Sequence, residues 1–100
     1  MKREVFNAYV DKICHLSKIQ KKELFSKNKR GDLASARHLL YFLCYNRPMT
    51  IGTIQGYMKE NGYSVKHPTI IYGIKIIRDR MKEDADYVHI AKEIERCVVL

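Results

Sequence analysis

Four consecutive residues, Lys66-His67-Pro68-Thr69, place hydrogen-bonding side chains around a proline, immediately before an isoleucine-rich stretch with helical spacing. Lysine and histidine can reach base edges or phosphates, and threonine offers a hydroxyl to a phosphate or a methyl to a thymine. Proline is tolerated in a first helical turn, because its missing N–H would have no intrahelical partner there. The free N–H groups of such a turn suit a phosphate. The pattern indicates either a nucleic-acid-binding helix start or only a well-capped one.

A second basic feature lies earlier in the chain. Residues 18–30, KIQKKELFSKNKR, hold six basic residues and one acidic residue. Residues 1–50 hold 11 Lys and Arg against 4 Asp and Glu, whereas residues 51–100 hold 8 against 7. Acidic side chains gather instead over 83–95, with five acids and one lysine. This separation of charge suits a protein that presents one face to a polyanion, although a basic run can also be only a solvated surface.

Length and composition predict one globular domain over residues 1–100. The chain is 46% hydrophobic and 30% charged, and no apolar run approaches the ~20 residues that span a bilayer. The N-terminal segment has an amphipathic pattern rather than that of a signal peptide. Cys14, Cys44 and Cys97 are far apart and form no C-x-x-C pair. We therefore expect a cytoplasmic protein with no membrane association, in which each thiol is a small buried apolar group.

Apolar periodicity predicts an all-α fold of about six helices. The first helix covers residues 3–16, and a short helical turn ending at Ser26 leads into a basic loop over 26–31. Asp32 is the expected N-cap of the next helix, which ends at Arg47-Pro48 because a residue before proline avoids the helical region.

The second half of the chain predicts three more helices. Thr50 is the expected N-cap of a helix over 50–60, which Asn61-Gly62 closes. The next helix covers about 67–82, with Ile70, Ile74, Ile77 and Met81 as its core stripe. Asp84 to Asp86 are expected to break it, before a last helix over 86–100 whose core residues include Ile90, Ala91 and Ile94. Residues 50–82 therefore form a helix, a turn and a longer helix, which is the helix-turn-helix arrangement.

With this order of helices, the chain resembles the C-terminal DNA-binding domain of the bacterial replication initiator DnaA, over roughly residues 5–98. ELFSKNKRGDLASARHLLYFL (23–43) is similar to the family's basic loop and to the helix that follows with its arginine. TIGTIQGYM (50–58) is similar to the first helix of the family's helix-turn-helix. HPTIIYGIKII (67–77) is similar to its aspartate-histidine-threonine-threonine signature and recognition helix. The resemblance implies a six-helix, Trp-repressor-like domain.

The resemblance also implies site residues. In the family the basic loop enters the minor groove and the signature reads bases in the major groove. Lys29 or Arg30 would then be the minor-groove group, and Arg37 a DNA-backbone or loop-positioning contact. The expected DNA-binding residues are Lys27, Lys29, Arg30, Arg37, Thr50, Lys66, His67, Pro68, Thr69, Tyr72 and Lys75. Of these, Lys66, His67 and Pro68 are the base-reading positions and Thr69 contacts a phosphate.

The chain departs from the family's pattern at several positions. Lys66 replaces an aspartate, which exchanges an acceptor for a donor, and Pro68 replaces a threonine. The turn ENGYSVK (60–66) is about four residues longer, and Gln55 follows Ile54 where the family has glycine. We therefore expect the scaffold to carry over, but not the sequence specificity.

The sequence predicts a stand-alone double-stranded DNA-binding protein in replication or transcription control, which would suit a phage or mobile element. We expect no enzyme activity, cofactor or small-molecule substrate, since the five glycines never form a phosphate loop. We expect no metal site, because His15, His38 and His89 share no ligand spacing. Two alternatives stay open: a helical module that inhibits or adapts a host replication or transcription factor, or an RNA binder. A homodimer is also open.

Overall fold

One helix is buried on almost every side, and the other helices pack around it. The computed structural model describes residues 2–99, and in it helix α3 (Gly31–Tyr45) buries nine of its 15 residues. A helix that is apolar around most of its circumference belongs in a core rather than on a surface. Its main packing partners are the first and fifth helices of the chain. Its residues Leu33, Ala36, Leu40 and Leu43 are all buried.

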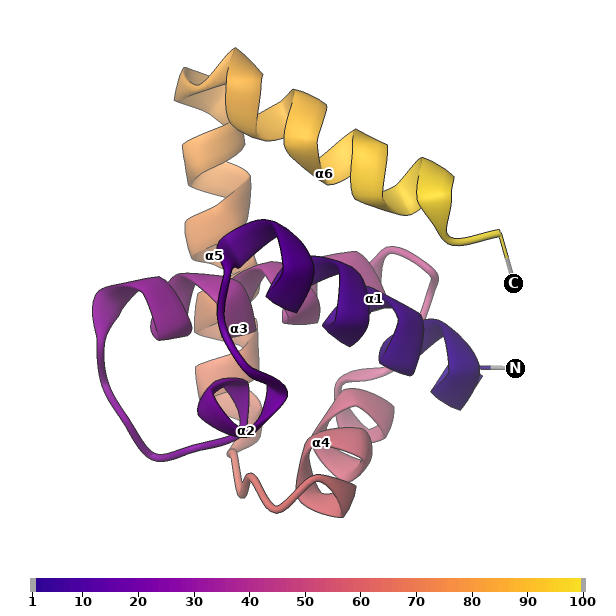
Figure 1. Cartoon of the computed structure of the whole chain (residues 1–100), viewed down its shortest axis with the longest axis vertical. Coiled ribbons are helices and arrows are strands. Elements are labelled where there is room, and N and C mark those ends of the chain that lie inside the picture. The colour runs from indigo at the N-terminus through magenta and orange to yellow at the C-terminus, as the bar shows by residue number, and fades with distance from the viewer. Residues whose placement is uncertain (1, 100) are drawn as a thin grey trace.

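The expected all-α fold is confirmed, since residues 2–99 contain helices and no strand. The six helices are α1 (Lys2–Ser17), α2 (Lys21–Leu24), α3 (Gly31–Tyr45), α4 (Ile51–Glu60), α5 (His67–Glu83) and α6 (Ala85–Cys97). Figure 1 shows α6 at one end of the molecule, with α2 and the α4–α5 turn at the opposite end. None of the helices described over this range is long and apolar enough to cross a membrane.

Most predicted helix ends are confirmed. Thr50 is the N-cap of α4, and its Oγ1 accepts a hydrogen bond from the Thr53 N–H at 3.1 Å. Gly62 closes that helix with a φ of 83°, a left-handed conformation that glycine adopts without strain. The expected break at Asp84 to Asp86 is shorter than predicted. Asp84 is the N-cap of α6 and accepts from the Tyr87 N–H at 3.1 Å.

The prediction of Asp32 as a helix N-cap is wrong. Arg30 occupies that position, and its backbone N–H donates to Asn28 Oδ1 at 2.9 Å, so the helix begins at Gly31. Asp32 lies in the first turn, where its carboxylate accepts from the Leu33 N–H at 3.0 Å and faces the positive end of the helix dipole. A local side-chain contact of Asn28 therefore moves the start of α3.

Core predictions hold for the isoleucines of α5 and fail in part elsewhere. Ile70, Ile74 and Ile77 are buried as expected, and Met81 is half-buried against the core. In α6 the prediction of Ile90 as a core residue is wrong, because its side chain is 45% exposed. Only Cys44 among the three cysteines is fully buried; Cys14 is half-buried and Cys97 is exposed. Cysteine has a small side chain, so Cys14 and Cys97 can lie on a helix without being fully buried in the core.

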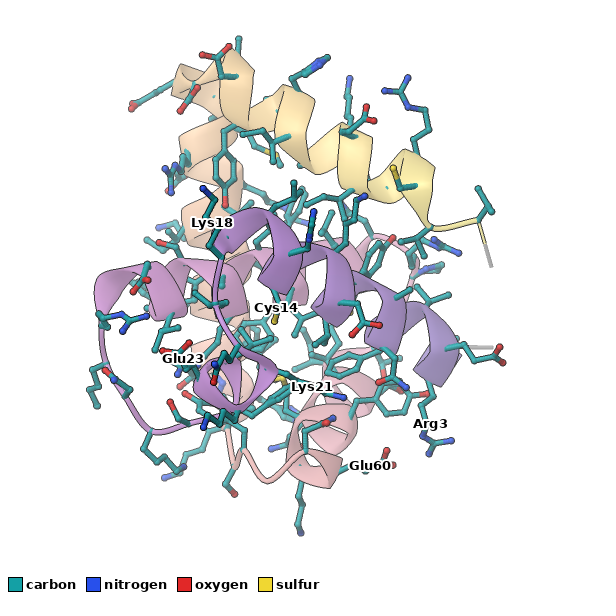
Figure 2. All side chains as sticks on the ribbon, viewed as in Figure 1. Arg3, Cys14, Lys18, Lys21, Glu23 and Glu60 are labelled. Carbon is teal, nitrogen blue, oxygen red and sulfur yellow. The ribbon has the colours of Figure 1, made fainter. Side chains whose placement is uncertain are left out.

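Two arginines join segments that are far apart in sequence through hydrogen bonds. Arg3 donates through Nε and Nη2 to the two carboxylate oxygens of Glu60, at 3.0 and 2.9 Å, which joins α1 to the end of α4. Figure 2 shows these two side chains extending toward one another. Arg47 donates through Nη1 to the Val98 carbonyl at 2.9 Å and to the Tyr9 hydroxyl at 3.2 Å. The C-terminal segment is thereby held against α1.

The crossing of α3 and α5 requires a residue without a side chain. A Cβ atom at Gly73 would lie 2.7 Å from His38 Cδ2 and 3.0 Å from Tyr41 Cδ2. Burial lowers the pKa of His38, with a smaller contribution from Arg37, and so favours its neutral ring in this contact. Glycine therefore allows the two helices to approach closely.

Gly73→Ala should lower the free energy of unfolding by about 1–3 kcal/mol, because the added methyl overpacks a crowded helix crossing. Chemical denaturation by urea, followed by circular dichroism, measures this change. Gly56→Ala is the matched control, since a Cβ there meets nothing within 4 Å. That change lies on the exposed face of α4 and should be neutral or stabilising by up to about 1 kcal/mol. Equal destabilisation by both changes would contradict the crowded crossing.

Candidate nucleic-acid interface

Two segments that are far apart in sequence meet at one end of the molecule. The first is the basic loop, predicted over 26–31 and found between α2 and α3 over 25–30. The second is the extended turn between α4 and α5, residues 61–66. Lys27 Nζ donates to the Ser64 carbonyl at 3.3 Å. The Tyr63 ring lies between two cations, with Lys27 Nζ 5.0 Å and the Arg37 guanidinium 4.9 Å from its centroid. Both segments lie along the lower edge of Figure 1 and form one surface.

Arg37 shapes the basic loop from beneath. Its Nε donates to the Leu24 carbonyl at 2.7 Å, and its Nη2 lies within hydrogen-bond distance of three more carbonyls, those of Ser26 at 2.7 Å, Asn28 at 3.0 Å and Glu23 at 3.3 Å. The residue is only 5% exposed. The donors of Arg37 thus serve backbone carbonyls, and a direct contact of Arg37 with DNA stays a prediction. Of the two roles that the resemblance implied, the structure shows loop positioning.

The three cations of the loop differ in how they are paired. Arg30 donates through Nε to Asp32 at 2.7 Å and through Nη2 to Glu23 at 3.4 Å. The hydrogen bond from Arg30 holds the pKa of Asp32 below its usual range. Lys29 is exposed and makes no hydrogen bond or ion pair with any residue of the described range 2–99. Lys29 is thus the loop cation whose charge is least compensated.

The start of α5 is open, as its sequence predicts. Lys66 occupies the N-cap position with extended backbone and makes no side-chain cap, and Pro68 lies in the first turn. Lys66, His67, Pro68 and Thr69 are all exposed. The predicted helix over 67–82 is confirmed within one residue at its end. The N-terminal turn of α5 therefore offers its exposed side chains beside the basic loop. The Thr69 and Ile70 N–H groups donate to the Lys66 carbonyl, at 3.1 and 3.3 Å.

Gln55 holds this helix start in place. Its Nε2 donates to the Val65 carbonyl at 2.8 Å, and its Oε1 lies 2.9 Å from His67 Nε2. Sequence reasoning noted Gln55 only as a departure from the family's pattern. Neither Gln55 nor Tyr63 was predicted as part of the site. Two departures from the family's pattern could have indicated them: the turn over 60–66, expected to be longer, and the polar Gln55 in place of glycine.

One face of α5 continues the surface away from the turn. Ile71 and Tyr72, at 54% and 58% exposure, are flanked by exposed Lys75. Exposed Arg78 and Lys82 follow Lys75 at helical spacing and were missed, although that spacing alone would have found them. The expected site residue Thr50 lies away from the extended turn, because it caps the N-terminal end of α4.

Two other features bear on what the surface can do. Within residues 2–99 there is no group of three or more His, Cys, Asp or Glu side chains placed to hold a metal ion. A groove of about 580 Å³ lies among α1, α3 and α6, with Leu16, Leu39 and Ile90 in its lining. This groove borders α6, at the opposite end of the molecule from the extended turn.

Comparison with known proteins found one kind of relative. No family model matches the chain, and no solved structure matches it. The chromosomal replication initiator protein DnaA from two strains of Leptospira biflexa serovar Patoc is 30% identical over 82 residues. The match covers 78% of this chain but only 17% of the relative's length. Most of the chain is thus similar to a small part of a replication initiator.

Arg37→Lys should destabilise the protein by about 1–3 kcal/mol, although the charge is kept. A lysine ammonium cannot reproduce the planar fork that serves four carbonyls, and buried carbonyls without donors are costly. Thermal unfolding monitored by circular dichroism measures the loss. Arg3→Lys, at an exposed ion pair, is the control and should leave the unfolding midpoint almost unchanged. A stable Arg37→Lys variant would show that the loop does not depend on the guanidinium.

Proposed function

We propose that this protein binds double-stranded DNA, with the start of α5 in the major groove and the basic loop in the adjacent minor groove. The observation that supports this most strongly is the joining of loop and turn through Lys27, Ser64 and Tyr63. It places an unpaired lysine and an open helix start on one surface. The protein would act as a binding module rather than an enzyme.

The dimensions of the molecule fit this arrangement. Its extents are 32 × 30 × 25 Å, enough to cover a major groove about 12 Å wide together with a neighbouring minor groove about 6 Å wide. A major groove of that width admits one α-helix. Pro68, Thr69, Tyr72 and Lys75 of α5 are exposed. RNA fits less well, because the deep, narrow major groove of A-form RNA does not admit side chains.

The charges fit as well. Lys29, Lys66, Lys75, Arg78 and Lys82 are exposed cations on the proposed surface, and such groups contact phosphates. The similar proteins are named chromosomal replication initiators. We therefore propose a role in replication or, failing that, in transcription control.

A second function has one observation in its favour. The exposed side chains of Leu16 and Ile90 line the groove beside α6, and exposed apolar surface of this kind marks protein contacts. A helical module that binds another protein would use this groove, and its affinity for duplex DNA would be weak and nonspecific. Duplex binding at varied salt distinguishes the two functions.

If the loop and α5 together neutralise about 5 to 7 phosphates, log K plotted against log salt concentration should have a slope of about −5 to −6. Counterions released from the duplex cause this dependence. Fluorescence anisotropy of a labelled duplex measures it at several salt concentrations. A slope shallower than about −2 would support the protein-binding function instead.

The loop cations should contribute unequally. Lys29→Ala should weaken binding to all sequences and reduce the slope by about one unit, because it removes a full contact with a phosphate. Arg30→Ala should have a smaller effect, since Asp32 and Glu23 already compensate its charge. Lys92→Ala, on α6, is the control and should change neither affinity nor slope. An effect of Lys92→Ala as large as that of Lys29→Ala would place the DNA elsewhere on the protein.

A further inference from the structure

We propose that Gln55 determines which base edge His67 reads, because it holds the His67 ring in a single tautomer. This inference rests on the proposed DNA-binding function and adds to it a residue that sets sequence preference. Gln55 stands where the family that the chain resembles has glycine.

The hydrogen bonds of Gln55 fix the orientation of its amide. Its Nε2 lies 2.8 Å from the Val65 carbonyl oxygen, which can only accept a hydrogen bond. The reversed amide would bring two acceptors together, so the NH₂ group must face Val65. The amide oxygen then faces His67 and lies 2.9 Å from Nε2. Because an amide oxygen also only accepts, His67 Nε2 must carry a hydrogen.

The tautomer decides what His67 offers to DNA. A neutral imidazole that is protonated at Nε2 has an acceptor at Nδ1. Within residues 2–99 no hydrogen bond to His67 Nδ1 is found, and the side chain is exposed at the first position of α5. Nδ1 is thus left to accept from a base.

An acceptor selects bases that carry an amine. In the major groove adenine presents its N6 amine and cytosine its N4 amine, whereas guanine presents the acceptors O6 and N7. His67 should therefore favour adenine or cytosine at the base it meets. Its neighbour Lys66 can only donate and favours guanine. Lys66 would then donate to a base and His67 would accept from one. Gln55 would keep His67 in the tautomer that accepts.

A purely structural role for Gln55 makes a different prediction. Through Val65 the amide also fixes the end of the turn, so its loss could lower stability without changing base preference. The test therefore measures the ring tautomer and the preferred base separately. Gln55→Met keeps the length of the side chain and removes both hydrogen bonds. Gln55→Glu keeps the acceptor for His67 and removes the donor for Val65.

The first measurement is made on the free protein, at about pH 8, where histidine side chains are generally neutral. The ¹⁵N chemical shifts of the His67 ring show which nitrogen is protonated. The wild-type protein should show hydrogen on Nε2 alone, and Gln55→Met should raise the fraction protonated at Nδ1. A wild-type ring protonated at Nδ1, or identical tautomers in both proteins, would overturn the proposal whether or not DNA is bound.

The second measurement is selection of bound duplexes from a random library. The wild-type protein should prefer adenine or cytosine over guanine at one position by about three- to tenfold, the worth of one hydrogen bond. Gln55→Met should lose that preference but keep those at other positions. Gln55→Glu keeps an acceptor for His67 Nε2–H and should keep the preference for adenine or cytosine. An unchanged preference in Gln55→Met would overturn the role in base reading.

The two measurements separate the failure of this inference from the failure of the proposed function. If the wild-type protein binds no duplex, DNA binding and base reading by His67 are both overturned. The NMR result would still show whether Gln55 fixes the ring. If duplexes bind with the expected salt dependence but without a preference at this position, only the base-reading inference fails.

Discussion

A single buried guanidinium shapes the surface on which the proposed function depends. Arg37 lies within α3, the most buried helix, and its four carbonyl partners all belong to the segment from Glu23 to Asn28. A charge placed there would be costly without these partners, because burial removes its hydration. The basic loop folds around Arg37 so that its carbonyls accept from the guanidinium. The Tyr63 ring stacks on the same guanidinium. Arg37 therefore contacts both the basic loop and the turn of the helix-turn-helix.

The extended turn between α4 and α5 connects several parts of this arrangement. Tyr63 and Ser64 of the turn contact Lys27 of the basic loop, and Gln55 holds the end of the turn at Val65. Arg3 and Glu60 fix the end of α4 against α1. Loop, turn and helix start are thus held by contacts from several helices. Such support keeps side chains in place before a ligand arrives, which reduces the entropy lost on binding.

The sequence predicted what depends on local chemistry. The helices, the Thr50 cap, the Gly62 closure and the open start of α5 follow from periodicity and from capping preferences, which act within a few residues. It failed where distant residues decide. Ile90 fits a core pattern but faces a groove that α1, α3 and α6 form. The burial of Arg37 and the contact of Lys27 with Ser64 were likewise invisible without the fold. The start of α3 is an exception, because a local hydrogen bond from the Arg30 N–H to Asn28 accompanies a helix start that leaves Asp32 in the first turn.

The central claim is that the basic loop and the start of α5 form one DNA-binding surface. An NMR titration of the ¹⁵N-labelled protein with a selected duplex tests it most directly, because each backbone amide reports separately. The amides of residues 27–30 and 62–75 should shift together at a single stoichiometry, while those along α6 stay unchanged. Shifts confined to α1 and α6 around the groove, or shifts in the loop without any in α5, would contradict the claim.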